Sequence, residues 1–174
     1  MMNISAIENY VSQLELTDIE GNKIPIGNGN KIWLSIFREA TCPFCNIRVY
    51  EMTQKAEYFL KSDIRIVAIF KSSSSDTKKF IAQQPRPFQI VADPDASIYR
   101  GLSLRSSFSA KLKAILLQMP RLLRGLSLTG TRGLVTSNQL PADILLDGKA
   151  KVLKIYTAKD ISDHIPFSEV DRFI

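Results

Sequence analysis

The sequence of 174 residues contains little histidine and little cysteine. It has a single histidine, His164, and two cysteines, Cys42 and Cys45. A structural zinc site takes four ligands, usually all cysteine or histidine. This chain would need a symmetric dimer or a carboxylate ligand to complete such a site. We therefore predict no metal site and no bound cofactor.

Long apolar runs are also missing. No uninterrupted apolar stretch approaches the roughly 20 residues of a membrane-spanning helix. The first twenty residues carry Glu8, Glu15, Asp18 and Glu20 rather than the apolar block of a signal peptide. We therefore expect a cytoplasmic protein with no membrane insertion. In a reducing cytoplasm, a pair of neighbouring cysteines is more often catalytic than structural.

Acidic residues are absent between Ala96 and Ala142. Because the net charge of the whole chain is +6, the seven basic residues of this stretch account for more than all of it. Such a segment can form a solvated basic face, or it can meet an acidic partner or an anionic lipid surface. Nucleic acid is disfavoured because only Tyr99 and Phe108 accompany the charges as aromatic residues on which bases could stack. The seven basic residues are Arg100, Arg105, Lys111, Lys113, Arg121, Arg124 and Arg132.

The length and the apolar content of 45% suit one domain over residues 1–174. Alternating strand and helix patterns predict parallel strands, and a closing hairpin adds antiparallel ones. We therefore predict the α/β class, as a thioredoxin-like three-layer α/β/α sandwich. It has a mixed central sheet, an N-terminal hairpin, and a helical insert at about 102–139 before the final β-hairpin. The expected strands are 16–18 and 23–26 (the first hairpin), 32–37, 64–70, 88–91, 143–146 and 152–156, and the last helix starts near Ser168.

Apolar residues recur at helical spacing within the insert, and basic residues occupy the opposite face. We expect Pro120 to break or kink this helix before its last turn. We also expect the apolar face to pack on the main body and to narrow access to Cys42. The alternatives are a plain cover for the sheet edge, a dimer contact, a dock for an acidic partner, and adhesion to anionic lipid. The apolar face comprises Leu112, Ile115, Leu116, Met119, Leu122 and Leu123.

The motif Cys42-Pro43-Phe44-Cys45 follows an apolar strand pattern and begins a helical one. A thiolate at a helix N-terminus is stabilised by free amide groups and by the helix dipole. Cys45 lies one turn along, where it can attack a disulfide formed on Cys42. We predict that Cys42 is the nucleophile, that Cys45 resolves the intermediate, and that an intramolecular disulfide forms. Two inert buried cysteines are the alternative.

These residues resemble the thioredoxin superfamily, and within it the peroxiredoxin-like alkyl hydroperoxide reductase C/thiol-specific antioxidant (AhpC/TSA) branch. The resemblance implies an oxidoreductase with an antioxidant role. It acts on a small hydroperoxide or a protein disulfide, and a thioredoxin- or glutathione-type reductant recycles it. The matching segments are 16–18 with Gly21, 37–38, 41–46, 93–94, 140–147, and Tyr156 with 160–166.

The same resemblance assigns substrate contacts to Thr41, Pro43, Phe44 and Pro141. It also implies a cis peptide bond between Leu140 and Pro141, packed against the dithiol.

Two departures from the family pattern bear on activity. Glu39 stands where peroxiredoxins carry a threonine or serine, and Pro141 stands where they carry an arginine. We therefore expect disulfide exchange to outrun peroxide reduction, with a thiol-dependent peroxidase as the alternative. A non-enzymatic binding module on the same scaffold is the third possibility, and a homodimer is left open. Arg38 or Arg132 could replace the missing arginine.

Three further side chains have competing interpretations. His164 could shuttle protons, or it could be held by hydrogen bonds in a turn flanked by Asp160 and Asp163. Arg48 is interpreted as a surface charge that could instead favour the thiolate of Cys42. Trp33 lies within the central strand and is expected to be core.

Overall fold

A five-stranded mixed sheet forms the centre of the computed structural model, which describes residues 3–83, 86–130 and 136–174. The strand order is β5-β4-β3-β6-β7. The four pairings confirm the predicted mixed sheet: β3 pairs parallel with β4 and β4 with β5, whereas β6 is antiparallel to β3 and to β7. The strands are β3 (Lys31–Ile36), β4 (Ile64–Phe70), β5 (Gln89–Ala92), β6 (Ala142–Leu146) and β7 (Val152–Thr157).

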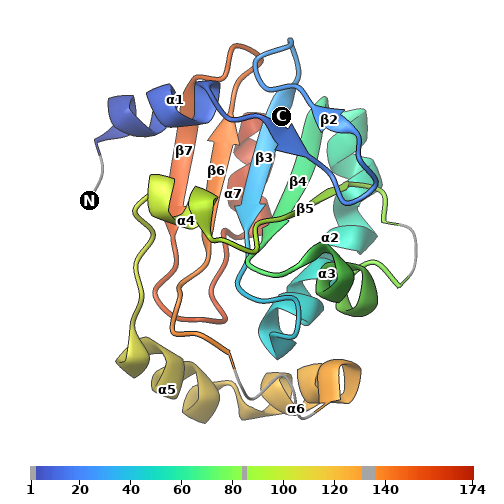
Figure 1. Cartoon of the computed structure of the whole chain (residues 1–174), viewed down its shortest axis with the longest axis vertical. Helices are drawn as coiled ribbons and strands as arrows, with labels where there is room; N and C mark the ends of the chain where they lie inside the picture. Colours follow the sequence, from blue (N-terminus) through green and yellow to red (C-terminus); the bar gives the residue numbers. More distant parts are fainter. Residues whose placement is uncertain (1–2, 84–85, 131–135) are drawn as a thin grey trace.

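Helices cover both faces of this sheet, so the predicted three-layer sandwich is confirmed (Figure 1). Alternate residues of β3 point to opposite faces, which places Trp33 in one core and Ile32 and Leu34 in the other. The Trp33 side packs against α2 (Pro43–Lys61) and α7 (Phe167–Val170), and α3 (Ser74–Phe80) adds its C-terminal end. The other side packs against α1 (Ile4–Ser12), α4 (Ser97–Gly101) and the hairpin of β1 (Leu16–Thr17) and β2 (Lys23–Ile24).

Helix α2 carries the dithiol motif and is anchored along its length. Cys42 is its N-cap residue and Pro43 occupies the first turn, where a missing N–H costs nothing. Val49, Met52 and Phe59 are essentially fully buried against the sheet. Burying a side chain of this size contributes about 1.5–3 kcal/mol. This packing fixes the start of α2 beside the carboxyl end of β3.

The start of α1 differs from the sequence pattern. Ser5 and Glu8 have the spacing of a capping box, but the N-cap is Asn3, whose side chain accepts from the amide of Ser5 at 3.3 Å. Glu8 instead accepts from the backbone N–H of Val152 at 3.0 Å. The carboxylate of Glu8 therefore ties α1 to the edge strand β7.

The insert folds into two helices, α5 (Phe108–Leu117) and α6 (Met119–Thr129). The break predicted at Pro120 is confirmed, although Pro120 lies in the first turn of α6 rather than near the end of one helix. The 3₁₀ helix Asp171–Phe173 follows α7 at the C-terminus. No helix in the described ranges is both long and apolar enough to cross a membrane.

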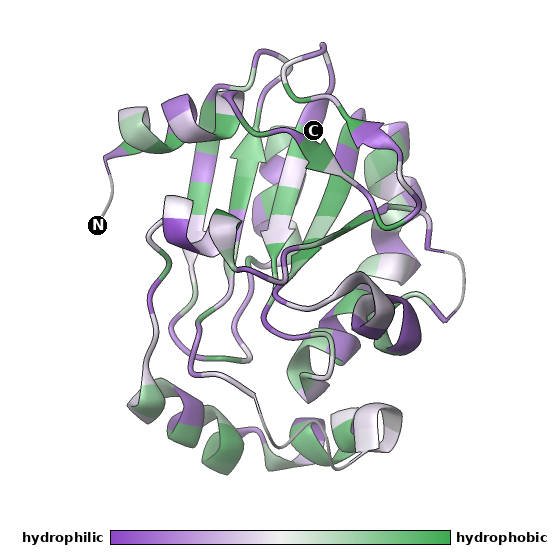
Figure 2. Ribbon diagram, viewed as in Figure 1, coloured by the Kyte–Doolittle hydropathy of each residue, from purple (hydrophilic) through white to green (hydrophobic). Residues whose placement is uncertain are grey.

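The expectation that the apolar face of the insert is buried is wrong for most of its residues. Leu122 is buried, but Leu112, Leu116, Met119 and Leu123 are exposed. The inward side of the insert is formed by other residues. Ala114 is buried, Gly125 abuts α2, and Ile115 and Leu126 pack partly buried against the core. Figure 2 shows apolar colouring along both helices, at the end of the molecule away from the sheet.

The cis bond predicted at Leu140–Pro141 is also wrong, because residues 3–83, 86–130 and 136–174 contain no cis peptide bond. Pro141 leads directly into β6, where Ala142 pairs with Ile36 and with Thr157. The carbonyl of Pro141 accepts from the amide of Ala158 at 3.3 Å. An extended trans residue suits this entry into a strand.

Candidate active site

Cys42 lies at the junction between a buried strand and a buried helix. After β3 the chain turns, and the amide of Cys42 donates to the carbonyl of Glu39 at 2.9 Å. Asn46 closes the turn, because its Nδ2 donates to the carbonyls of Ala40 at 2.7 Å and Cys42 at 3.0 Å. As the N-cap of α2, Cys42 also faces the positive end of the helix dipole.

Arg38 is the cation of the site and is fully buried. Its Nη1 donates to the Sγ of Cys42 at 3.2 Å. Its Nη2 donates to Thr136 Oγ1 at 2.9 Å and to the carbonyl of Ser137. Glu39 completes the arrangement, with Oε2 3.9 Å from the guanidinium and Oε1 accepting from the amide of Ser137 at 3.0 Å. The predicted auxiliary residue Arg38 is therefore held in direct contact with the sulfur of Cys42.

The two cysteines titrate in opposite directions. Burial alone would raise the pKa of Cys42. That effect is exceeded by the hydrogen bond from the Cys45 thiol, the charge of Arg38 and the Cys45 amide, so its pKa falls from 9.0 to about 6. Burial, and then the neighbouring Cys42, raise the pKa of Cys45 well above 9.0. At neutral pH Cys42 is therefore a thiolate and Cys45 a thiol, which matches the roles predicted for a nucleophile and a resolving residue.

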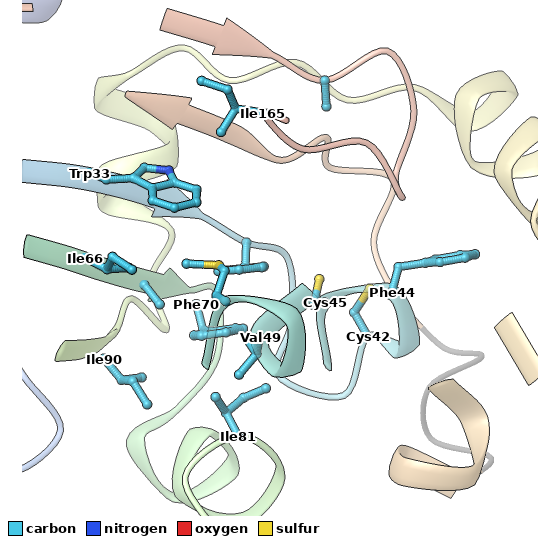
Figure 3. Packing of buried hydrophobic residues seen from close by; sticks show 14 of the residues in the cluster. Trp33, Cys42, Phe44, Cys45, Val49, Ile66, Phe70, Ile81, Ile90 and Ile165 are labelled. Carbon is cyan, nitrogen blue, oxygen red and sulfur yellow. The ribbon is translucent and has the colours of Figure 1, made fainter. Parts of the chain in front are cut away.

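Both sulfurs are enclosed. Cys42 and Cys45 are free thiols with no exposed surface. Helix α6 lies against the first turn of α2, where a Cβ on Gly125 would fall 2.5 Å from a side-chain atom of Pro43. Figure 3 shows the two sulfurs at the start of α2, with Phe44 pointing away from the sheet. The insert lies against the turn that carries these thiols, and its narrowing of access to Cys42 stays a prediction.

The residues predicted to contact substrate lie around this point. Thr41 and Pro43 flank Cys42, and Thr41 is half-buried whereas Pro43 and Phe44 are buried. Pro141 lies at the same end of the sheet, because the next residue pairs with the last residue of β3. Their contact with substrate stays a prediction. Arg132, the other candidate for the missing arginine, lies outside the described residues.

His164 belongs to a second buried polar cluster. Its Nδ1 is 3.3 Å from Oδ2 of Asp143, and its ring centroid is 4.7 Å from that of Phe37. The prediction of a hydrogen-bonded histidine is confirmed, but the partner is Asp143 rather than a flanking carboxylate. Burial would raise the pKa of Asp143, yet it is lowered by the hydrogen bond and charge of His164 and by Arg48. Asp143 also accepts from Trp33 Nε1 (2.9 Å), Ser35 Oγ (2.7 Å) and the Ile165 amide (3.0 Å).

Arg48 is not the surface charge that the sequence suggested. It is buried, and its Nη2 donates to the carbonyl of Ile165 at 2.6 Å. Its guanidinium stacks on the ring of Phe167 at 3.9 Å and lies 5.7 Å from the ring of Trp33, which is core as expected. Arg48 therefore anchors the C-terminal segment to α2.

Sequence reasoning missed the loop that holds Arg38. Thr136 lies 98 positions along the chain from Arg38, and no periodic pattern marks its segment. Only the antiparallel pairing of β6 with β3 brings residues 136–137 to the end of β3. In the part of the chain that the structure describes, no group of three or more histidine, cysteine or acidic residues could hold a metal ion.

Comparison with known families gives one match, to the AhpC/TSA family, over residues 7–119. The matched segment includes the dithiol motif and ends at the start of α6. No curated protein sequence matches the chain.

Solved structures share the fold at low sequence identity. The bacterioferritin comigratory protein of Xanthomonas campestris, whose structures concern alkyl peroxide reduction, aligns with a TM-score of 0.64 and 13% identity over 95% of this chain and 90% of its own. Peroxidoxin BcpB of Mycobacterium tuberculosis aligns with a TM-score of 0.61 and 13% identity, covering 91% and 87%. A putative thiol:disulfide interchange protein DsbE of Chlorobium tepidum aligns with 0.55 and 19%, covering 82% and 79%.

Proposed function

Since the chain belongs to the AhpC/TSA family and is an oxidoreductase, we propose that Cys42 and Cys45 form its redox-active dithiol–disulfide couple. The observation that carries this proposal is the contact of 3.2 Å between Arg38 and the sulfur of Cys42. That contact helps to keep Cys42 ionised, and only the thiolate form of cysteine is an effective nucleophile.

We further propose that the oxidant is a small hydroperoxide, which reverses the order of the two activities expected from Glu39 and Pro141 in the sequence. The sulfur of Cys42 has no exposed surface, and an exchange reaction with a folded protein requires the two sulfurs to meet in line. A hydroperoxide needs far less room. Arg38 can hold the peroxide oxygens because guanidinium N–H groups beside a thiolate also face the oxygen that the thiolate attacks. The Xanthomonas campestris neighbour, which is described with an alkyl peroxide reduction activity, lends support to this choice.

The reaction then has two steps on the protein. The Cys42 thiolate attacks the distal oxygen of the hydroperoxide. The O–O bond breaks, the departing alkoxide takes a proton to become the alcohol, and Cys42 becomes a sulfenic acid. The Cys45 thiol gives up its proton and attacks the sulfur of Cys42, forming the disulfide while the hydroxyl leaves as water.

A second dithiol must return the disulfide to the reduced state. We propose a thioredoxin-type donor, which is itself oxidised to a disulfide in the exchange, with a glutathione-type donor as the alternative. This recycling suits a reducing compartment such as the cytoplasm.

Disulfide exchange is the second candidate function, and Glu39 favours it. Its carboxylate occupies the position where peroxiredoxins carry a hydroxyl, and it lies 3.9 Å from the guanidinium of Arg38. It therefore competes with a peroxide for the same cation. The Chlorobium tepidum neighbour is described as a putative thiol:disulfide interchange protein.

Rapid-mixing kinetics separate the two candidates. The reduced protein is mixed with hydrogen peroxide or with insulin, and the Cys42–Cys45 disulfide is followed by mass spectrometry. We expect peroxide to react faster than insulin. Cys42→Ser should abolish both reactions. Cys45→Ser should stop at a sulfenic acid that a dimedone-type reagent traps after peroxide, and at a mixed disulfide after insulin. Faster oxidation by insulin would make disulfide exchange the function. Initial oxidation at Cys45 would reverse the roles of the two cysteines, and oxidation without a Cys42–Cys45 disulfide would contradict the couple itself.

A substitution at Gly125 tests whether enclosure sets the choice of oxidant. A Cβ at this position meets Pro43 at 2.5 Å, so Gly125→Ala should push α6 away from α2. We expect the reaction with insulin to rise about tenfold, because local opening limits access to buried groups, and the reaction with peroxide to change little. Ser127→Ala, on the exposed side of α6, is the control. Equal effects on both oxidants would mean that enclosure does not select between them.

A further inference from the structure

The two helices of the insert expose an unusual amount of apolar surface. Among the described residues, six of the twelve large hydrophobic side chains that are exposed belong to α5 and α6. We call these six side chains the insert face. Soluble monomers rarely expose apolar side chains gathered on one element unless that surface binds something. The insert face comprises Phe108, Leu112, Leu116, Leu117, Met119 and Leu123, with exposures between 42% and 69%.

The spacing of these residues gathers them on the outer side of each helix. Phe108, Leu112 and Leu116 follow each other at intervals of four along α5, and Met119 and Leu123 do the same along α6. The inner side is occupied by smaller or better buried residues, as the close contact of Gly125 with Pro43 shows. Figure 2 shows apolar colouring on both helices at this end of the molecule, interrupted by hydrophilic stretches.

The two helices of the insert carry charge of one sign. Residues 96–142 contain no aspartate or glutamate. Arg105, Lys113 and Arg124 are exposed next to or within the two helices. Arg121 is engaged with Glu51 of α2 at 2.7 Å. The surface around the apolar residues is therefore cationic, and an occupant must offer both apolar groups and negative charge.

Two other occupants, and a membrane-spanning position of these helices, fit this combination poorly. A second copy of the chain would bring a cationic surface against an identical one, and a symmetric dimer repeats every like-charge contact. Single-stranded nucleic acid stacks on aromatic side chains, and Phe108 is the single aromatic residue of the insert face. A spanning position is also excluded for these helices, because they have 10 and 11 residues and a bilayer needs about 20.

We propose that the insert face docks the protein on the surface of an anionic phospholipid bilayer. The apolar side chains enter the boundary between headgroups and acyl chains, while Arg105, Lys113 and Arg124 lie among the negatively charged headgroups. Because α6 packs on the first turn of α2, docking holds the dithiol end of the molecule toward the membrane (Figure 1). This inference does not depend on the proposed function, since it concerns binding and not the thiols.

Vesicle sedimentation tests the proposal with the full chain. The probes are vesicles of phosphatidylcholine alone and vesicles in which about one third of the lipid is phosphatidylserine. We expect binding to the anionic vesicles, weaker binding as salt is raised because charge interactions are screened, and little binding to the neutral ones. Equal binding to both vesicle types, or to neither, would overturn the proposal.

Two double variants separate the apolar and the electrostatic contributions. Leu116→Ser with Leu117→Ser removes exposed apolar groups, and Lys113→Ser with Arg124→Ser removes exposed charge. We expect each pair to weaken binding to the anionic vesicles about tenfold or more. Peroxide turnover in solution should stay unchanged, which separates a failure of docking from a failure of the proposed function.

Matched controls use exposed residues of the same kinds elsewhere. Tyr58→Ser with Leu60→Ser removes apolar groups at the far end of α2, and Lys149→Ser with Lys151→Ser removes two positive charges from the turn between β6 and β7. These variants should bind like the unmodified chain. A loss as large as in the insert variants would show unspecific adhesion and overturn the assignment. Sedimentation equilibrium that shows a dimer abolished by the leucine pair, without vesicle binding, would assign the face to a second copy instead.

Discussion

At the scale of single residues, one buried arginine decides the chemistry of the site. A buried guanidinium is costly unless charges and hydrogen bonds compensate it. Arg38 is compensated by the thiolate of Cys42, by the carboxylate of Glu39 at 3.9 Å, and by Thr136 and Ser137. The planar group suits this role better than lysine would, because it reaches several acceptors in fixed directions. Glu39 both holds the arginine and moderates its effect on the sulfur.

Replacing Arg38 should make Cys42 a weaker nucleophile at neutral pH. In Arg38→Met the pKa of Cys42, now about 6, should rise because burial remains while the cation is lost. We expect oxidation at neutral pH to slow by about 10²-fold, the usual cost of losing one fixed electrostatic donor. The rate of Cys42 alkylation by iodoacetamide, measured against pH, reports the shift.

The matched control for this substitution is Arg65→Met. Arg65 is a partly buried arginine that donates to Gln89 at 2.8 Å near the start of β4, at the opposite end of the sheet. The substitution Arg65→Met should leave both the pH profile of Cys42 alkylation and the oxidation rate unchanged. An alkylation midpoint that does not move in Arg38→Met would show that the helix and Cys45 alone sustain the thiolate.

At the scale of secondary-structure elements, local sequence patterns predicted the elements themselves but not their distant partners. The apolar run of β3 and the helical spacing after Cys42 define both elements and place the dithiol at their junction. Arg48 shows the limit. Its position on α2 faces inward, but its charge suggested solvent, and the ring of Phe167 on which it stacks comes from the distant C-terminal segment. A sequence pattern does not reveal a partner of that kind.

The insert illustrates the same limit from the opposite side. The sequence predicted its helical periodicity and the break at Pro120. Periodicity alone did not identify which side of the helices packs inward. One contact of the insert with α2 is made where Gly125 lets α6 approach Pro43. A contact that depends on a missing side chain produces no apolar pattern in the sequence. The hydrogen bond from Arg38 to Thr136 could not be predicted from the sequence either, since 98 positions separate the two residues.

The Asp143 carboxylate joins three elements, and removing it should destabilise the protein. It accepts from Trp33 and Ser35 of β3 and from the amide of Ile165 before α7. Asp143→Ala leaves these buried donors unpaired, so we expect a loss of about 3–5 kcal/mol in the free energy of unfolding. Ser35→Ala removes a single donor and should cost about 1 kcal/mol. Urea denaturation at neutral pH measures both, and equal losses would contradict a central role for the carboxylate.

Acid should reduce the difference in the free energy of unfolding between the unmodified chain and Asp143→Ala. The pKa of Asp143 lies below its ordinary value of 3.8 in the folded protein. Its stabilising contribution is therefore complete above 3.8 and is lost as the pH falls through the folded pKa. Denaturation near neutral pH and again at pH 3 or below, compared between the two proteins, follows this loss.

At the scale of the whole molecule, function and charge gather at one end. The dithiol, Arg38 and the insert lie together where β3 ends and α2 begins (Figure 1). The insert helix α6 contributes both the cover over α2 and part of the insert face. A movement of α6 would therefore change access to Cys42 and the presentation of the apolar surface together.

The redox state of the couple should change how the stability of the whole molecule depends on pH. In the reduced protein the pKa of Cys42 is about 6, against 9.0 for an ordinary cysteine. Between these values the unfolded chain holds a proton that the folded chain has lost, so the free energy of unfolding rises with pH, by at most about 1.4 kcal/mol per pH unit. The raised pKa of Cys45 acts in the opposite direction only above about pH 9, where the unfolded thiol ionises.

We therefore predict that reduced protein gains stability from about pH 6 to about pH 8 relative to the Cys42–Cys45 disulfide form, which has no titrating thiol. Urea denaturation of both forms at several pH values in this range gives the two slopes. Reduced Cys42→Ser should follow the shallower slope of the disulfide form, because the residual thiol of Cys45 ionises only at higher pH. Parallel slopes for reduced and oxidised protein would show that Cys42 is not ionised in the folded state, and the nucleophile would then have to be activated by the substrate itself.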